Sequence, residues 1–381
     1  MEDVLILGAC RTPIGSLNGA LASCTAPHLG AKAIAAAVAQ AGVKPEDVGE
    51  VVLGNVVSAG IGQAPARQAM IAAGLPPSTG ATTVDKVCGS GLKAVMMAAQ
   101  SILLGECDVA VAGGMESMSK APFLLDRARS GYRLGHGQLL DSIIKDGLWD
   151  PYHDFHMGMC GEMCAEKYAI DRRAQDEFAL ESYRNAQQAQ RSGAFDAELA
   201  DVEGVKDDEE PGRISLEKVP KLKPAFKPGG TITAANASKI SDGAAAVVLA
   251  AASASAGRPV LARVKGWATF SQEPAWFTTA PVGALQKLLV HVGWRKEDVD
   301  LYELNEAFAV VPLAAIRLEG IPREKVNVHG GAIALGHPLG ASGARILVTL
   351  VHALKRRGLR RGVAAICLGG GEAVAMAVER E

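Results

Sequence analysis

Short runs of apolar residues recur along the chain, separated by longer stretches in which small apolar residues repeat at helical spacing. In the first part, the apolar runs predict strands at 4–9, 50–57, 82–87 and 108–114. The stretches between them predict helices at 31–41, at 67–73 and from the turn at 88–91 to about 103. Because strands alternate with helices, we expect an α/β fold with a mainly parallel sheet and helices on both faces.

The second part of the chain repeats this order of features. In both parts a helix closed by a glycine leads into a strand, a turn of small residues opens another helix, and a later strand ends in glycines. These features lie at 31–42, 50–57, 88–103 and 108–114 in the first part, and at 284–293, 301–304, 340–347 and 363–371 in the second. The pattern therefore predicts an internal duplication, with two similar α/β halves that face a shared site.

The stretch from 115 to about 237 has no counterpart in the second part. It holds a helical pattern at 172–190 and a charged segment rich in proline and glycine at 203–230. A long insertion between two rigid halves is suited to binding a ligand, whereas its outer parts are typical of a solvated surface.

Composition narrows the classes of function. The chain has 381 residues, of which 49% are apolar, and a formal net charge of −2, so it has no overall attraction to nucleic acid or to an anionic membrane. No apolar run is long enough to span a membrane, and the start and end of the chain show neither a secretory signal nor a peroxisomal address. The seven scattered cysteines are typical of reduced thiols, so we expect a cytoplasmic protein.

The segment around Cys88 is the first candidate for chemistry. It consists of an extended run, a tight turn at 88–91 and an apolar helix. A cysteine just before a helix lies where backbone N–H groups and the helix dipole favour an anion, and we expect its pKa to fall below the usual value of about 8.5. Cys88 is therefore a candidate nucleophile, although a buried structural cysteine fits the same pattern.

Three segments of the second part supply partners for this cysteine. Asn305 follows a strand, His337 lies in a loop of small residues at 330–343, and Cys367 ends a strand before three glycines. The loop lacks the lysine of a phosphate-binding loop, and its glycines do not fit a dinucleotide fingerprint. His337 lies at the turn equivalent to that of Cys88, which favours a general base over an ordinary buried histidine.

Four segments together resemble the signatures of the thiolase family, most closely its biosynthetic acetoacetyl-CoA branch. They are Val87-Cys88-Gly89-Ser90-Gly91, Asn305-Glu306-Ala307-Phe308-Ala309, Gly336-His337-Pro338 and Cys367-Leu368-Gly369-Gly370-Gly371. The resemblance covers essentially the whole chain. It implies thiolase halves at 1–117 and 258–381 and an inserted loop domain at 118–245, with the end of the N-terminal half near 238–252.

The resemblance also implies a reaction of fatty acid metabolism. It is a reversible Claisen condensation of two acetyl-CoA to acetoacetyl-CoA and coenzyme A (CoA), through an acetyl-cysteine and without a metal or redox cofactor. Cys88 would be the acylated nucleophile, and His337 would accept its proton and help to hold the thioester oxygen of the second substrate. Cys367 would remove the α-proton of that substrate. Asn305 would hold a water in the same oxyanion site, and the N–H groups of Cys88 and Gly369 would form a second one.

The inserted segment carries further marks of the family. His156 and Met157 resemble the pair that lines the acyl pocket of the acetoacetyl-CoA enzymes. Ser238 would hydrogen-bond the pantetheine, and Leu222 and Phe226 would contact the adenine end. The other residues expected to bind CoA are Lys218, Ala234, Ala307 and Phe308.

Residues 118–149 resemble the loop through which family tetramers form. We therefore expect a homotetramer, built as a dimer of dimers, whose ligands are acetyl-CoA, acetoacetyl-CoA and CoA. The sequence departs from the family pattern at Asp85 and Ser241, where asparagine is usual. The segment 206–215 is also short, so the family's contacts to adenine and phosphates do not carry over to it. Cys160 and Cys164 have the spacing of a metal pair, but no third ligand is evident, which favours two helical core positions.

Three alternatives remain beside an acetyl-CoA acetyltransferase. A degradative 3-ketoacyl-CoA thiolase for longer chains would usually lack the His156-Met157 pair. A decarboxylating ketosynthase needs a second histidine where this chain has Asn305. A non-enzymatic acyl-CoA-binding scaffold would not need all the catalytic positions, which are filled here.

Overall fold

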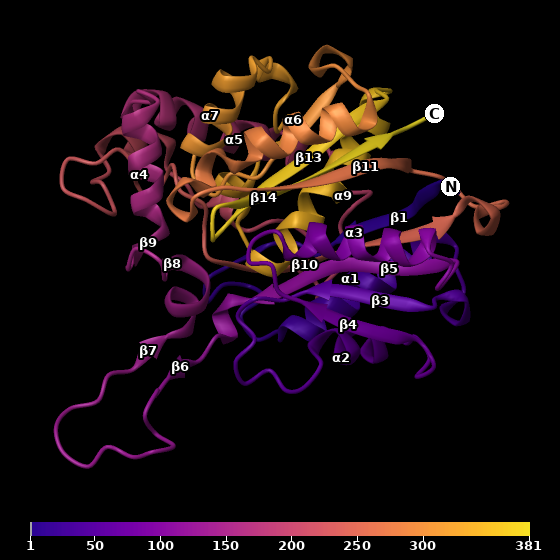
Figure 1. Cartoon of the computed structure of the whole chain (residues 1–381), viewed down its shortest axis with the longest axis horizontal. Helices are drawn as coiled ribbons and strands as arrows, with labels where there is room; N and C mark the ends of the chain where they lie inside the picture. The colour runs from indigo at the N-terminus through magenta and orange to yellow at the C-terminus, as the bar shows by residue number, and fades with distance from the viewer. Residues whose placement is uncertain (1) are drawn as a thin grey trace.

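The computed structural model describes residues 2–381 and shows five layers (Figure 1). Two helices, α3 (Ser90–Leu103) and α9 (Leu339–Arg357), form the central layer between two sheets. The outer layers are formed by α1 (Ala26–Ala41) and α2 (Pro65–Ala72) on one side and by α6 (Ala280–Val292) and α7 (Val310–Glu319) on the other.

The two halves of the chain contribute sheets with the same strand order. In the N-terminal half the order is β4 (Gly80–Val84), β3 (Glu50–Gly54), β5 (Val109–Ser117), β10 (Ser241–Ala251) and β1 (Val4–Arg11), and β2 (Gly15–Ser16) pairs with β10. In the C-terminal half it is β12 (Leu301–Leu304), β13 (Arg361–Leu368), β14 (Glu372–Glu379) and β11 (Ala262–Ser271). A single bridge between Tyr302 and Val326 takes the place of β4, and β1 pairs with β11, so the sheets are continuous. This order is the internal duplication that the pattern predicts.

The α/β class is confirmed, and the sheet is mixed. The pairs β3–β4, β3–β5 and β12–β13 are parallel. The pairs of β10 and β14 with their neighbours, and the pair β1–β11, are antiparallel. The expected predominance of parallel pairs is therefore not found, because β14 returns from β13 through a tight glycine turn instead of a crossover helix.

The apolar pattern predicts the C-terminal ends of two helices correctly, because glycines close them. Glycines in the left-handed region close α1 at Gly42 (φ 61°) and α6 at Gly293 (φ 68°), as the duplicated pattern predicts. Helix α1 begins five residues earlier than the pattern indicates, because Thr25 caps it and Pro27 is compatible with the first turn of a helix.

Small residues allow the central helices to approach each other closely. A Cβ on Gly91 of α3 would lie 2.8 Å from the backbone nitrogen of Ala344 in α9, and a Cβ on Gly114 of β5 would overlap the carbonyl oxygen of Gly340. The first turns of α3 and α9 therefore meet, and both N-terminal ends point to the region where the functional side chains lie.

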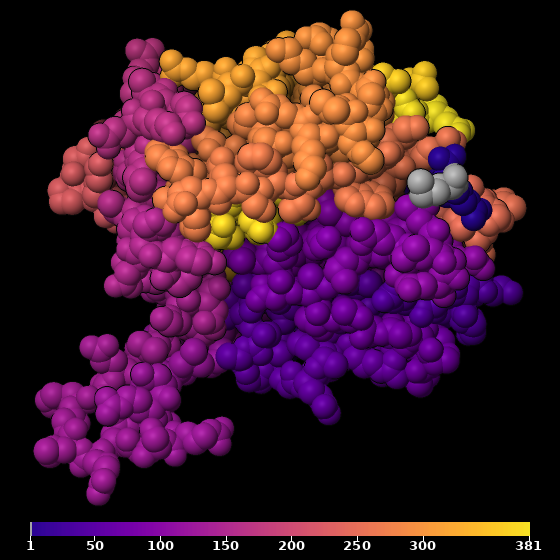
Figure 2. Space-filling view, in the orientation of Figure 1, coloured from indigo at the N-terminus to yellow at the C-terminus, as the bar shows by residue number. Residues whose placement is uncertain are grey.

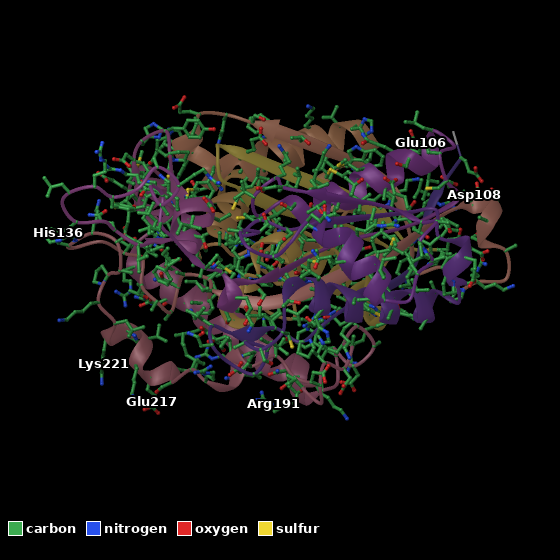
Figure 3. All side chains as sticks on the ribbon, turned by 90° about the horizontal axis from the view of Figure 1, so that it is seen from below. Glu106, Asp108, His136, Arg191, Glu217 and Lys221 are labelled. Carbon is green, nitrogen blue, oxygen red and sulfur yellow. The ribbon has the colours of Figure 1, made fainter. Side chains whose placement is uncertain are left out.

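The segment between β5 and β10 forms a layer at one end of the molecule. It contains η2 (Met118–Lys120), β6 (Phe123–Leu124), β7 (Leu140–Asp141), η3 (Ile143–Leu148), β8 (Trp149–Asp150), β9 (Phe155–His156), α4 (Met157–Lys167), α5 (Arg172–Arg191), η4 (Glu210–Gly212) and η5 (Leu216–Lys221). Residues 123–141, here called the arm, project from the body (Figure 2). Lys221 and Glu217 of η5 point outward (Figure 3).

The remaining short elements connect the layers described above. They are η1 (Pro45–Asp47), η6 (Ala252–Ser255), η7 (Pro274–Thr279), η8 (Lys296–Asp298), η9 (Arg323–Lys325) and α8 (Ala332–Leu335). Over residues 2–381, no helix is both long enough and apolar enough to cross a bilayer.

Candidate active site

Cys88 lies in the turn between β4 and α3, two residues before α3 begins. Local hydrogen bonds fix this turn: Asp85 Oδ1 accepts the N–H of Val87 at 2.9 Å, and Ser90 Oγ donates to the carbonyl of Val87 at 2.6 Å. The N–H of Lys86 donates to Ser90 Oγ at 2.8 Å. Val87 has a φ of 46°, which is unfavourable for a β-branched residue, so its surroundings must hold it there.

Two backbone N–H groups act on the sulfur of Cys88. One is its own, and the other belongs to Gly369 in the turn between β13 and β14 of the opposite half. Two fixed donors at one sulfur are suited to stabilising negative charge on the oxygen of an acyl group carried there.

The environment keeps Cys88 protonated at rest. Burial raises the pKa of its thiol to about 12; the two N–H groups oppose this shift, and the carboxylates of Glu116 and Asp85 add to it. The expected lowering of the pKa by the helix is therefore wrong. The reason is that α3 begins only at Ser90, while the sulfur is withdrawn from water and faces negative charge. Cys88 needs a base at the moment of attack.

Cys367, at the end of β13, lies in the same site. Its side chain is buried, and burial raises the pKa of the thiol well above its ordinary value, with a further rise from the charge of Cys88. This effect means that the sulfur of Cys88 lies close enough for a thiolate there to disfavour a thiolate on Cys367. The two halves thus bring one cysteine each to a common centre, as the sequence predicts.

His337 precedes α9 and is oriented by Ser342. The hydroxyl of Ser342 donates its single proton to the carbonyl of Pro338 at 2.8 Å, so it accepts from Nδ1 of His337, which lies 2.6 Å away. The other ring nitrogen, Nε2, therefore carries the lone pair, and it is buried without a partner among the described residues. Burial lowers the pKa of His337 to about 3, so the ring is neutral.

Two buried carboxylates hold the loop of His337 from both sides. Glu306 accepts the N–H of Ile333 at 3.1 Å, and Glu116 accepts the N–H of Gly340 at 2.9 Å. Glu116 comes from the N-terminal half and Glu306 from the C-terminal half, so the position of His337 depends on the contact between the halves.

Asn305 follows β12, directly beside the end of β13. Leu304 is paired with Ala365, and the N–H of Asn305 donates to the carbonyl of Ala365 at 3.0 Å, which places Asn305 beside the strand end that carries Cys367. Its side chain is buried, and neither its oxygen nor its nitrogen has a partner within the part of the chain that is described. A buried amide with free donor and acceptor groups is suited to holding a water or a substrate oxygen.

An apolar cavity of about 170 Å³ leads to His337. His156, Phe226, Ser238 and Phe308 form part of its wall. His156 caps α4 by accepting the N–H of Gly158 at 3.0 Å and stacks on Phe226 with ring centres 4.7 Å apart, so this wall is rigid.

The other residues expected to bind CoA lie around this cavity or farther out. Met157 is buried at the start of α4 in the apolar cluster that includes Cys367. The carbonyl of Ala307 accepts the N–H of Ser238 at 3.0 Å, which holds the segment of Ser238 against the Asn305 motif. Ala234 is exposed beside Ser238.

Leu222 and Lys218 lie apart from this cavity wall. Leu222 follows η5, and its carbonyl accepts from Arg172 at 3.1 Å; Lys218 is exposed on η5. Phe226, expected at the adenine end together with Leu222, lies in the cavity wall and stacks on His156.

Cys160 and Cys164 are buried in α4 as helical core residues. Within residues 2–381, no group of three or more His, Cys, Asp or Glu side chains is arranged to hold a metal ion.

Three residues that hold His337 or its loop do not stand out in the sequence: Ser342, Glu116 and Glu306. Ser342 lies five residues after His337 in the small-residue loop, and Glu306 directly follows Asn305, so their position in the motifs was an available signal. For Glu116 the only signal in the sequence is its position after a predicted strand. Its contact with Gly340 joins residues that are 224 positions apart, so no local motif contains both.

The chain is similar to known proteins over its whole length. Residues 4–253 match the family described as "Thiolase, N-terminal domain", and residues 258–380 match "Thiolase, C-terminal domain". The chain is 53% identical to "Acetyl-CoA acetyltransferase 2" of Arabidopsis thaliana (99% of this chain, 97% of the relative). It is 49% identical to "Acetyl-CoA acetyltransferase" of Cupriavidus necator over the full length of both.

A solved structure of the Acat5 thiolase from Ascaris suum in complex with coenzyme A superposes with a TM-score of 0.96, at 45% identity and full coverage of both chains. The family descriptions together cover nearly all of the sequence, and the relatives match it from end to end. This chain belongs to the thiolase family.

Proposed function

We propose that this protein is an acetyl-CoA acetyltransferase, which converts two acetyl-CoA to acetoacetyl-CoA and CoA and catalyses the reverse thiolysis. The observation that carries the proposal is the pair of neighbouring cysteines, one from each half, with the N–H of Gly369 directed at the sulfur of Cys88. The names of the relatives from A. thaliana and C. necator support the same activity.

In the first half-reaction, Cys88 attacks the carbonyl carbon of acetyl-CoA. Nε2 of His337 takes the thiol proton as the new C–S bond forms, and the N–H groups of Cys88 and Gly369 stabilise the oxyanion. The oxyanion collapses, the bond to the CoA sulfur breaks, and His337 returns the proton to the leaving thiolate. The products are acetyl-Cys88 and free CoA.

In the second half-reaction, Cys367 acts as its thiolate, the minor form that its raised pKa leaves, and removes the α-proton of another acetyl-CoA. His337 and Asn305 stabilise the resulting enolate oxygen, the latter through a water held by its free amide. The enolate carbon attacks the carbonyl carbon of acetyl-Cys88, and the bond between that carbon and the Cys88 sulfur breaks. The Cys88 thiolate takes the proton held by Cys367, which becomes a thiolate again, and acetoacetyl-CoA leaves. The proposal uses no metal or redox cofactor. Preorganised donors stabilise the negative charge that develops on oxygen, and each typically contributes on the order of 3 kcal/mol in a dry site.

The preferred substrates are short. His156 is fixed as the cap of α4 and stacked on Phe226, so the wall near His337 cannot easily yield to a longer acyl chain. This rigidity disfavours the alternative of a degradative thiolase for long chains.

Thiolysis of 3-ketoacyl-CoA substrates from four to ten carbons tests the function. We expect the highest kcat/KM with acetoacetyl-CoA, unchanged after exhaustive chelation. A higher kcat/KM with the ten-carbon substrate would favour the degradative alternative, and activity restored by zinc or magnesium would contradict the metal-free mechanism. If none of the substrates is cleaved, the alternative of a non-enzymatic acyl-CoA-binding scaffold is favoured.

Three further expectations belong to this proposal: a homotetramer that forms through the arm, a cytoplasmic location and a role in fatty acid metabolism. The arm carries exposed apolar side chains, which supports the first. The seven cysteines are free thiols, which supports the second. The acetoacetyl-CoA chemistry itself supports the third.

A further inference from the structure

Lys239 lies in the wall of the cavity, between Ser238 and the loop of His337. The residue is half-buried. The ammonium donates to the carbonyl of Ala237 at 2.9 Å and to the carbonyl of Ala234, and the ring of Tyr183 lies 5.8 Å from Nζ. One cation therefore ties together two carbonyls of the same turn.

That turn, residues 233–238, carries the group expected to bind pantetheine. Asn236 Oδ1 accepts the N–H of Thr233 at 2.8 Å, and the N–H of Ser238 donates to Ala307 at 3.0 Å. Other hydrogen bonds fix the middle of this turn: the N–H of Ala235 donates to Thr233 Oγ1 at 3.2 Å, and Asn236 Nδ2 donates to Asp176 Oδ1 at 2.9 Å. The carbonyls of Ala234 and Ala237 share the ammonium of Lys239, whose charge offsets the partial negative charge on both oxygens.

The backbone of Lys239 makes a second connection. Its carbonyl accepts the N–H of His337 at 3.0 Å and the hydroxyl of Ser241 at 2.9 Å. The side chain thus binds the turn of Ser238, while the main chain of the same residue binds the loop of the catalytic base.

We propose that Lys239 is a positioning residue, which couples the 233–238 turn to the loop of His337 and makes the binding of acyl-CoA depend on its charge. This inference rests on the proposed function for the identity of the ligand. Its geometry requires only that a CoA chain enter the cavity past Ser238.

The charge of Lys239 changes in an accessible pH range. Burial lowers the pKa of its ammonium to about 8, against the attraction of Glu210 in η4. Tyr183 in α5 faces it with a pKa raised well above the ordinary value, and burial lowers the pKa of both His156 and His337. Between pH 7 and 9 these three groups stay neutral, so Lys239 is the group among them that loses its charge.

Protonation of Lys239 strengthens its hydrogen bonds to the turn and therefore the binding of acyl-CoA. Below pH 8 the protonated amine makes charge-assisted hydrogen bonds, which are about twice as strong as neutral ones. Above pH 8 the neutral amine holds the two carbonyls less firmly, and binding of acyl-CoA weakens.

Equilibrium binding of S-ethyl-CoA tests this proposal, because this thioether has no thiol that titrates and no carbonyl that reacts. For the unmodified protein we expect the Kd to rise about fivefold from pH 7 to pH 9, the scale of one typical hydrogen bond. Lys239→Met keeps the aliphatic stem and should show the weaker Kd at both pH values. Lys239→Arg stays charged and should bind tightly at both.

Lys44→Met is the matched control, since Lys44 is exposed on the connection between α1 and η1. It should follow the unmodified protein at pH 7 and 9. If Lys239→Met keeps the same Kd and the same pH dependence as the unmodified protein, the proposal for Lys239 is overturned while the proposed function stands. If the unmodified protein does not bind S-ethyl-CoA at all, both are overturned. Should Lys239→Met fail to fold, the pH dependence of the unmodified protein and of Lys239→Arg decides alone.

Discussion

At the scale of single residues, burial sets the resting state of the site. It raises the pKa of Cys88 to about 12 and lowers that of His337 to about 3, so the thiol and the imidazole are both uncharged. A stable thiolate–imidazolium pair is disfavoured in such a site. Proton transfer therefore has to accompany the attack on the thioester, and it is the oriented Nε2 of His337 that makes this possible.

The two cysteines can be separated by substitution. Acylation of Cys88 needs His337 but no cleavage of a C–H bond, so Cys367→Ala should still be acetylated by acetyl-CoA, with the label on Cys88 in peptide mass mapping. It should lose condensation by a factor of roughly 10² to 10⁴, the usual worth of a general acid–base group. It should also fail to exchange the α-hydrogens of acetyl-CoA with deuterium from solvent.

Cys88→Ala provides the matched comparison and should not be acetylated at all. Cys160→Ala, in the buried core of α4, should keep both acylation and exchange, and it controls for the loss of any buried thiol. Exchange at the native rate in Cys367→Ala would show that Cys367 is not the base.

Ser342 gives a second prediction at this scale. In Ser342→Ala, Nδ1 of His337 loses the acceptor that fixes the tautomer. Because one such hydrogen bond is worth about 1 kcal/mol, we expect the rate of Cys88 acetylation to fall about fivefold or more. Stopped-flow measurement of CoA release in the first turnover checks this, with the exposed Ser253→Ala as control. An unchanged rate would mean that Ser342 does not orient the base.

At the scale of elements, the sequence predicts most of the fold, because helix stops such as Gly42 and Gly293 and the alternation of strands and helices are local signals. It also points to Cys88, His337, Cys367 and Asn305, the residues of the proposed mechanism, because they lie within recognisable motifs. Strand direction and the lowered pKa expected for Cys88 fail for the same reason. Both depend on what packs against an element from far away in the chain, and a local pattern does not contain that information.

Gly114 tests how far the site depends on close packing of elements. A Cβ there would overlap the carbonyl of Gly340, whose N–H is held by Glu116 next to the loop of His337. We expect Gly114→Ala to lower the free energy of unfolding by about 3 kcal/mol, through overpacking, and to reduce thiolysis further than any loss of folded protein explains. Denaturant unfolding and kcat measure the two effects. Gly212→Ala, where a Cβ meets nothing within 4 Å, should change neither, and equal behaviour of both variants would contradict the prediction.

At the scale of the whole molecule, each half is incomplete without the other. The N-terminal half supplies Cys88 and Glu116, and the C-terminal half supplies the second N–H donor, the base and Cys367. The inserted layer closes the cavity with His156 and Ser238. In this duplicated fold the first turns of α3 and α9 meet. Divergence of the preceding turns gives the proposed nucleophile, Cys88, on one side and the proposed base, His337, on the other.

The arm, residues 123–141, contributes no residue to the site between the two halves. Within it, Leu134 is fully exposed, Leu139 is 69% exposed and Phe123 is 63% exposed, and the arm extends away from the body (Figure 2). Apolar side chains on a projecting segment need a partner surface. We expect the unmodified protein to have the mass of four chains, because the arms of one dimer pack against those of another.

Since Leu124 pairs directly with Leu140, residues 125–139 can be replaced by Asn-Gly, which favours a two-residue turn between the same strands. Sedimentation should then show the mass of two chains, while acetylation of Cys88 persists because the arm contributes no residue to the site. Leu134→Asp alone should weaken the tetramer, since it buries a charge in the same contact. A mass of four chains after the replacement would show that the arm is not the tetramer contact.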